Sequence, residues 1–415
     1  MQNIKTKLKE NQQLITAWRT LRRISKKIIR LPLFIIGYLM IIPVSYLTPK
    51  KNYVVLTTRF GDFEGNLKYF FLYLNNLEEQ DWEFVFLTEK KEVYRQLKDK
   101  GFQVWFYPGL FTILKLFRTR ILIVDGNEWA KNLKYFFLFS AKKVQLWHGT
   151  GLKTIGLLKP AIKNLSRFRQ MLKKEYTYYD LLVLTSEYQV KMRSKAFRYG
   201  KLLVNGYPRN DIFFKETDFD YSLGSDYSLI EKCRQYKNEG FSLVTYTPTW
   251  RKFDHSLHLD LDSLDDFAGK NSIKFIIKLH YKHDCSPEVS RHKNIIEYDK
   301  YTDVYPLLAV TDLLITDYSS IYLDYLLLEK PIIFFPYDID EYTDNERQLL
   351  IDFGQVTPGP KVYSQEELNK ELHAHIVEGK DWYNLQREEQ RKKFFKYRDG
   401  KSSERLWSAV KKDML

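Results

Sequence analysis

The stretch Lys143-Val-Gln-Leu-Trp-His148-Gly-Thr-Gly-Leu-Lys153 is an apolar run that ends in a histidine and two glycines. Two further runs also end in polar clusters, Ile273-Lys-Phe-Ile-Ile-Lys-Leu-His280 and Leu313-Leu-Ile-Thr-Asp-Tyr-Ser-Ser320. Short apolar runs bounded by turn residues and followed by helical patterns are typical of buried parallel strands. Ligands of open α/β sheets bind beyond the carboxyl ends of such strands. The three clusters therefore predict one cleft that combines a titratable imidazole with sites for phosphate.

An alternation of apolar runs and helical patterns extends along most of the chain. Strands are expected first at Tyr53–Thr57, Phe84–Thr88, Ile121–Val124, Lys143–Trp147 and Leu181–Thr185. After a polar linker at Asp218–Asp226, they are expected again at Phe241–Tyr246, Ile273–Leu279, Leu313–Thr316 and Ile332–Phe335. We therefore predict an α/β protein with two Rossmann-like domains, residues 51–217 and 218–415, which face each other across a cleft.

The composition is that of a folded protein with an anionic partner. Of the 415 residues, 44% are hydrophobic, which is enough for two cores. The formal net charge of +14 predicts a membrane surface, a phosphorylated substrate or a nucleic acid as partner. The two cysteines, Cys233 and Cys285, provide no disulfide framework.

Residues 1–50 differ from the rest of the chain. Apolar and basic side chains alternate at helical spacing up to Arg30, as in a basic amphipathic helix on an anionic membrane surface. The apolar run Leu31–Leu47 contains Pro32 and Pro43 and is shorter than the about 20 residues of a straight membrane span. We expect a membrane-associating segment that attaches from the cytoplasmic side. The alternative is a hydrophobic helix docked on the first domain.

His148 is the first candidate catalytic residue. Its ordinary pKa of about 6.5 suits a general base, and Gly149 and Gly151 allow the backbone to approach a ligand closely. The alternative is a histidine that only caps the end of a strand through a backbone hydrogen bond.

Two further segments carry candidate phosphate ligands. In Tyr207-Pro-Arg-Asn-Asp211 the guanidinium of Arg209 can bind a phosphate with two hydrogen bonds, although a surface turn with a helix cap explains the segment equally well. Thr249, Trp250 and Arg251 follow another apolar run, and this grouping suits a nucleotide, with Thr249 and Arg251 at the phosphate and Trp250 packing against the ligand.

Lys278 and His280 lie on one face of a predicted strand end and can both donate to a diphosphate. Ser319 or Ser320 precedes a predicted helix at Ile321–Glu329, whose N-terminus favours an anion; simple helix capping is the alternative. Asp324 can accept hydrogen bonds from polyol hydroxyls, or it can be a solvated helix residue. The residues around His280 do not have the spacing of a zinc motif, so we predict no metal.

Five motifs in order resemble those of the CDP-glycerol glycerophosphotransferase family, the bacterial enzymes that prime and polymerise wall teichoic acid. They are His148-Gly-Thr-Gly-Leu-Lys153, Pro208-Arg-Asn-Asp211, Thr247-Pro-Thr-Trp-Arg251, Lys278-Leu-His280 and Asp317-Tyr-Ser-Ser320 with Asp324. The resemblance covers roughly Lys50 to Lys401. Gly151 departs from it, because family members commonly have proline at this position, and this leaves acceptor preference open.

The resemblance implies a GT-B fold that uses CDP-glycerol, or CDP-ribitol, without a cofactor. His148 would be the base, and the segment of His148, Gly149, Thr150, Gly151 and Leu152 would approach the glycerol phosphate. The other expected donor contacts are Arg209, Thr249, Trp250, Arg251, Lys278, Leu279, His280, Ser319, Ser320 and Asp324. His280 would also take part in catalysis by stabilising charge on the diphosphate as CMP leaves.

The expected acceptor is a lipid-linked polyprenyl-diphosphate glycan at the cytoplasmic face of the bacterial cell membrane, where the enzyme would be a peripheral protein. One alternative is a GT-B glycosyltransferase that uses a nucleotide sugar. A nucleic-acid-binding protein is a weaker alternative, since the basic residues are scattered and form no known module, and we expect no nucleic-acid partner. Whether the enzyme primes or polymerises remains open.

Overall fold

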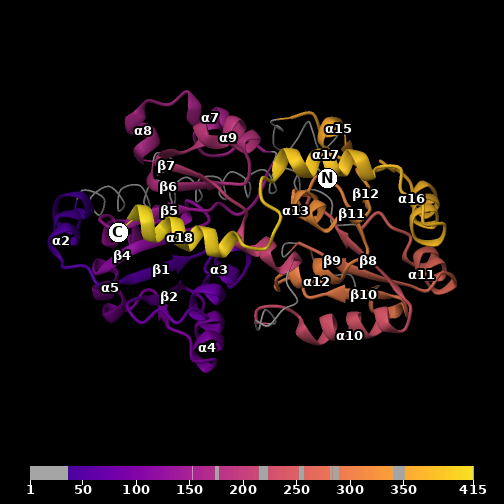
Figure 1. The fold of residues 1–415 in the computed structure, drawn as a ribbon, viewed down its shortest axis with the longest axis horizontal. Coiled ribbons are helices and arrows are strands. Elements are labelled where there is room, and N and C mark those ends of the chain that lie inside the picture. The colour runs from indigo at the N-terminus through magenta and orange to yellow at the C-terminus, as the bar shows by residue number, and fades with distance from the viewer. Residues whose placement is uncertain are drawn as a thin grey trace, which may run out of the picture.

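The fold has two lobes, each built on a parallel β-sheet (Figure 1). The computed structural model describes residues 36–414, except residue 152 and segments 173–176, 215–222, 252–256, 281–282, 284–288 and 340–350. The first sheet has seven strands and the second has five. This arrangement confirms the predicted α/β class with two Rossmann-like domains. The predicted domain boundary falls between residues 217 and 218, outside the described residues.

The first sheet has the strand order β3-β2-β1-β4-β5-β6-β7. Because the order reverses between β1 and β4, the crevice expected of a Rossmann sheet lies at their carboxyl ends. Thr57 at the end of β1 pairs with Val124 at the end of β4, which places the residues after both strands at this point. The strands are β1 (Tyr53–Thr57), β2 (Glu83–Thr88), β3 (Val104–Phe106), β4 (Thr119–Val124), β5 (Lys142–Gln145), β6 (Tyr178–Leu184) and β7 (Arg198–Val204).

The second sheet repeats this arrangement in the order β10-β9-β8-β11-β12. Its order reverses between β8 and β11, where Thr247 pairs with Thr316. The strands are β8 (Ser242–Thr247), β9 (Ile273–Lys278), β10 (Ile295–Tyr298), β11 (Leu313–Thr316) and β12 (Ile332–Phe334). The inner strands β1 and β11 are buried along their whole length, as expected of parallel strands covered on both faces.

Helices cover both sheets. In the first lobe they are α2 (Ile42–Leu47), α3 (Gly65–Asn75), α4 (Lys91–Asp99), α5 (Leu110–Phe117), α6 (Lys134–Phe137), α7 (Pro160–Lys163), α8 (Arg167–Leu172) and α9 (Glu187–Arg193). The helices that follow along the chain are α10 (Tyr227–Asn238), α11 (Leu261–Lys270), α12 (Tyr305–Val310), α13 (Ile321–Tyr325), α15 (Phe353–Val356), α16 (Gln365–Leu372), α17 (Asn384–Phe394) and α18 (Ser402–Met414).

Lys68 on α3 forms a buried ion pair with Asp303 of the second lobe at 2.9 Å, which helps to hold the lobes together.

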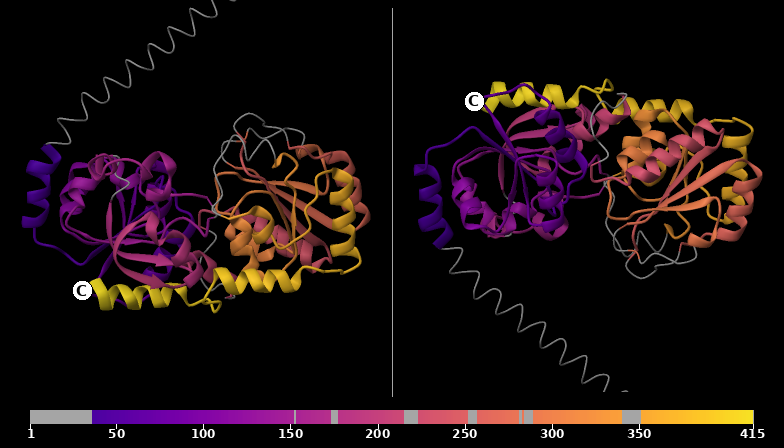
Figure 2. Two further views of the ribbon diagram at one scale, coloured as in Figure 1. Left: turned by 90° about the horizontal axis from the view of Figure 1, so that it is seen from above. Right: turned by 90° about the horizontal axis from the view of Figure 1, so that it is seen from below.

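The C-terminal helix α18 returns to the first lobe, although its residues lie in the predicted second domain. Figures 1 and 2 show α17 and α18 running in succession along one side of the molecule, with α18 against the first lobe. Trp407 packs edge-on against Phe84 at 5.3 Å, and its Nε1 donates to Glu79 at 3.0 Å. The chain therefore crosses between the lobes a second time. A single boundary in the sequence does not divide it into two structural domains.

Only the end of the predicted membrane-associating segment is described, because residues 1–35 lie outside the described ranges. A helical turn at Gly37–Ile41 leads into α2 and packs on α6, with Tyr38 edge-on to Phe136 at 5.5 Å. On the outer side Leu39 and Leu47 are 72% and 82% exposed. In the described part of the chain, no helix has both the length and the apolar character needed to cross a bilayer.

Candidate active site

The carboxyl ends of both sheets line one cavity of about 580 Å³ between the lobes. Loops after β1, β4 and β5 contribute Glu64, Asp125 and His148 from the first lobe. The second lobe contributes Lys278 at the end of β9, His280 from the loop after it and Ser319 from the loop after β11. Three of the clusters quoted from the sequence therefore meet in one cavity, as the strand-end argument predicted.

His148 is held by a turn that directly follows β5. Its Nδ1 lies 3.1 Å from the backbone oxygen of Asp125. Because a carbonyl oxygen only accepts, this contact assigns the proton to Nδ1 and leaves the lone pair of the neutral ring on Nε2. The pKa of His148 is lowered below its ordinary value. Restricted hydration in the cleft is the main cause, and the positive charge of nearby arginines adds to it. The imidazole is therefore a neutral proton acceptor at physiological pH.

Gly149 allows Arg209 to reach the backbone beside His148. A Cβ at Gly149 would lie 2.9 Å from Nη2 of Arg209, so a larger residue would displace the guanidinium. Nη1 of Arg209 donates to the backbone oxygen of His148 at 2.7 Å. Arg193 donates to the backbone oxygen of Gly149 at 2.9 Å. The glycine thus lets two buried guanidinium groups fix the loop that carries His148.

Asp324 lies behind Arg209 rather than at the surface of the cavity. It is 1% exposed, and its carboxylate accepts from Arg209 at 2.5 Å, Asn210 at 3.1 Å and Tyr305 at 2.7 Å. The structure brings Arg209 to the cavity, as the sequence suggested, but gives Asp324 an ionic partner on the other lobe. In this arrangement Asp324 positions a guanidinium, and its predicted contact with the donor stays a prediction.

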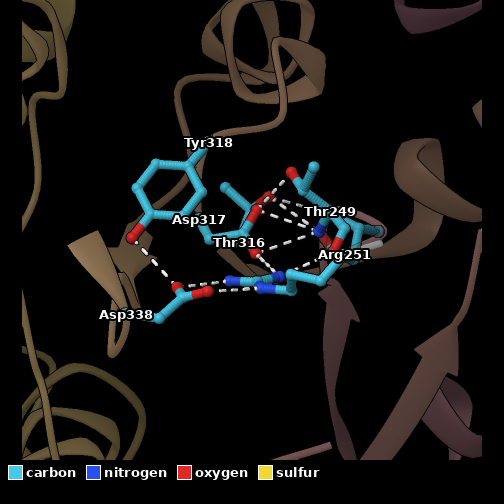
Figure 3. A network of polar contacts seen from close by, with 7 residues as sticks. Thr249, Arg251, Thr316, Asp317, Tyr318 and Asp338 are labelled. Carbon is cyan, nitrogen blue, oxygen red and sulfur yellow. Dashed lines mark hydrogen bonds and ion pairs between the residues drawn. The ribbon is translucent and has the colours of Figure 1, made fainter. Parts of the chain in front are cut away.

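Arg251 belongs to a buried polar network, which Figure 3 shows from close by. Its Nη1 donates to Asp317 at 2.5 Å, while Nε and Nη2 donate to Asp338, each at 2.8 Å. Asp317 also accepts from the backbone N–H of Thr249 at 2.9 Å and from its hydroxyl at 2.5 Å. Since Arg251 is only 6% exposed, it orders the Thr249 loop in this structure rather than facing the cavity.

The remaining predicted residues have different surroundings. The ring of Trp250 lies 6.4 Å from that of His280. Leu279 lines the cavity although it is 2% exposed. Ser319 lines the cavity, whereas Ser320 begins α13 without a capping bond from its side chain. Thr150 is buried, Gly151 is half-buried, and Leu152 lies outside the described residues.

The sequence argument missed four acidic residues that line the cavity, which are Asp62, Glu64, Asp125 and Asp303. Asp125 directly follows the apolar run Ile121–Val124, so the strand-end rule points to it in the same way as to His148. Glu64 directly precedes α3. Among the described residues, no group of three or more acidic, histidine or cysteine side chains is arranged to hold a metal ion.

Comparison with known proteins agrees with this fold. The chain is 30% identical over 283 residues to the teichoic acid glycerol-phosphate transferase of Staphylococcus aureus (strain NCTC 8325 / PS 47), which covers 64% of this chain and 70% of that protein. It is 26% identical over 284 residues to the ribitol-phosphate polymerase TarL of the same organism, covering 65% of this chain and 48% of TarL. A solved variant of the wall teichoic acid polymerase TagF superposes with a TM-score of 0.73 at 21% identity over 95% of this chain and 96% of the TagF chain.

The model of one protein family matches most of the chain, from residue 40 to residue 412. The match includes both sheets, every cavity residue described above and most of α18. The chain therefore belongs to the CDP-Glycerol:Poly(glycerophosphate) glycerophosphotransferase family.

Proposed function

We propose that this chain transfers glycerol phosphate from CDP-glycerol to a hydroxyl of a teichoic-acid-type acceptor and releases CMP. The observation that carries the proposal is the placement of a neutral imidazole in the same cavity as Lys278, His280 and Ser319. A hydroxyl acceptor needs a base, and a diphosphate donor needs cations and hydrogen-bond donors. The family description, with CDP-glycerol as its first substrate, supports the same assignment.

In the proposed reaction the first lobe supplies the base and the second lobe binds the donor. The donor lies along the second lobe, where Lys278, His280 and Ser319 contact its phosphates. Nε2 of His148 takes the proton of the acceptor hydroxyl. The resulting oxygen attacks the phosphorus that bears glycerol, and the bond from that phosphorus to the bridging oxygen breaks. CMP leaves with the bonding electron pair, and Lys278 and His280 stabilise the charge that collects on it.

CDP-ribitol is the second candidate donor. The resemblance of this chain to TarL favours it, since TarL is named for ribitol phosphate. The two donors differ in the length of the polyol, not in the nucleotide or the diphosphate. The purified protein is expected to release CMP and extend the acceptor with CDP-glycerol, as measured by mass spectrometry. Faster extension by ribitol phosphate would reverse the donor assignment, while UDP release from a nucleotide sugar would replace it with glycosyl transfer.

The acceptor that we propose is a lipid-linked polyprenyl-diphosphate glycan, met at the cytoplasmic face of the bacterial membrane. The basic sequence before Arg30 and the exposed apolar side chains of Leu39 and Leu47 support this location. Full-length protein should bind anionic vesicles more strongly than neutral ones, and salt should weaken the preference. A variant that lacks residues 1–35 should lose the preference for anionic vesicles but still act on a short soluble acceptor. Equal binding of both vesicle types would count against an electrostatic attachment.

A further inference from the structure

Glu64 and Asp125 lie at the point where the strand order of the first sheet reverses. Asp125 directly follows β4, and Glu64 lies on the connection from β1 to α3. Since β1 and β4 are neighbours that end in register, the two carboxyl groups reach the same side of the cavity. The backbone oxygen of Asp125 also accepts from Nδ1 of His148 at 3.1 Å. One residue therefore both orients the proposed base and places a carboxyl group close to it.

Other acids around the cavity are engaged by cations. Asp62 pairs with Lys90, Glu128 pairs with Arg59 at 3.1 Å, and Asp303 pairs with Lys68. In contrast, Oδ1 of Asp125 is buried without a hydrogen-bond partner, and the residue is only 5% exposed. Glu64 lines the same cavity, and within the described ranges it forms no ion pair or side-chain hydrogen bond.

The carboxyl of Asp125 has a backbone hydrogen bond from Arg59, but its Oδ1 lacks a partner. A buried carboxyl oxygen without a partner is costly to the folded protein unless a ligand satisfies it. Restricted hydration raises the pKa of Asp125 to about 7, and the charge of Glu64 contributes to this rise. Restricted hydration, Asp62 and Asp303 raise the pKa of Glu64. The charges of Lys278 and Lys90 oppose this rise, and the resulting pKa is about 7. Near neutral pH each of the two carboxyl groups is therefore partly protonated, so together they can both accept and donate hydrogen bonds.

The chemistry of the pair favours hydroxyls over phosphates. Carboxylates repel the phosphate groups of a donor. Lys278 and His280 of the second lobe are cationic and hydrogen-bonding partners for those phosphates in the same cavity. A polyol presents hydroxyls that both donate and accept hydrogen bonds, which suits two partly protonated carboxyl groups. Building on the proposed function, we propose that Glu64 and Asp125 bind the hydroxyls of the acceptor's terminal polyol and hold one of them toward Nε2 of His148.

The test uses full-length Glu64→Gln and Asp125→Asn proteins with CDP-glycerol and an acceptor that ends in glycerol phosphate. Each variant should raise the acceptor KM by about 10-fold or more, because an amide can still form a hydrogen bond but lacks the negative charge that strengthens it. The Kd for CDP-glycerol, measured by calorimetry, should stay close to that of the wild type. Glu92→Gln is the matched control, because Glu92 is exposed on α4, away from the cavity.

A second acceptor sharpens this result. Replacing its terminal glycerol by propane-1,3-diol removes one hydroxyl. This should raise the acceptor KM of the wild type but have little further effect on the KM of Glu64→Gln or Asp125→Asn.

An unchanged acceptor KM in both variants would overturn the proposal. A loss of donor binding as large as the loss of acceptor binding would also overturn it. A loss of activity that Mg²⁺ restores would assign the pair to a cation instead. If wild-type protein releases no CMP from CDP-glycerol with any acceptor, the proposed function itself fails.

Discussion

Arg209 and Asp324 form a buried ion pair at 2.5 Å that joins the loop carrying His148 to the second lobe. The guanidinium donates to the backbone of His148 and to the carboxylate of Asp324 at the same time. The position of the proposed base therefore depends on a charge supplied by the opposite lobe. A change in the distance between the two lobes would therefore move Arg209 and, with it, the loop that carries His148.

The ion pair makes a prediction for Asp324→Ala. This change leaves a buried guanidinium without its counter-charge, which typically costs about 3–5 kcal/mol of folding stability. It should also lower kcat, because Arg209 no longer holds the His148 loop. Urea unfolding and CMP release measure the two effects. Tyr305→Phe removes one neutral donor to the same carboxylate and should have a smaller effect on both. Wild-type stability in Asp324→Ala would refute this role.

The pH dependence should separate the carboxyl pair from the base. His148 has a lowered pKa, so its neutral form persists until the pH falls below its ordinary value of about 6.5. Glu64 and Asp125 take up protons near pH 7. The acceptor KM should therefore rise as pH falls through about 7, whereas the loss of kcat should come at lower pH. In Glu64→Gln the rise in KM should be smaller and should occur at lower pH, because only Asp125 then titrates and the charge of Glu64 no longer raises its pKa. A single titration affecting kcat and KM together would contradict this separation.

Asp125→Asn should stabilise the protein, because the folded state raises the pKa of this carboxyl from 3.8 to about 7. Ionisation of Asp125 therefore disfavours folding. The penalty is absent below pH 3.8, grows as the pH rises and is complete above about pH 7. Removing it should add on the order of a few kcal/mol at pH 8 and much less at pH 4. Thermal unfolding at both pH values measures this. A lower Tm for the variant at pH 8 would show that the carboxylate supports the fold instead.

A chelator should leave activity largely intact. The acids of the buried networks are already neutralised by side chains, as Asp317 is by Arg251 and Asp303 by Lys68. Lys278 and His280 supply the groups that face the donor phosphates in the proposed reaction. CMP release measured with and without EDTA tests this. Complete loss that Mg²⁺ restores would assign a cation to the site.

Much of the fold follows from the sequence because central parallel strands are buried on both faces. The predicted ranges Tyr53–Thr57 and Leu313–Thr316 coincide with β1 and β11. The strands that were not predicted, β3, β7 and β10, are all sheet edges. An edge strand such as Arg198–Val204 is partly exposed and carries polar residues, so it lacks a continuous apolar run.

The candidate site was only partly predictable. Strand-end reasoning identified His148, Lys278 and Ser319, because each follows a recognisable apolar run. It could not show that Arg251 is paired with Asp338, since the partners lie 87 residues apart and on different loops. Arg209 and Asp324 likewise suggested separate ligand contacts until the structure placed them together. Long-range pairing of charges depends on how the lobes pack, which local patterns do not encode.

The most direct test of the central claim compares wild type, His148→Ala and His280→Ala for transfer from CDP-glycerol to the acceptor. Mass spectrometry follows the product and calorimetry follows donor binding. His148→Ala should lose roughly 10²–10⁴-fold in turnover, the usual contribution of a general base, and still bind CDP-glycerol. His280→Ala should lose donor binding as well as turnover. Near-normal turnover in His148→Ala would contradict its role as the base that activates the acceptor.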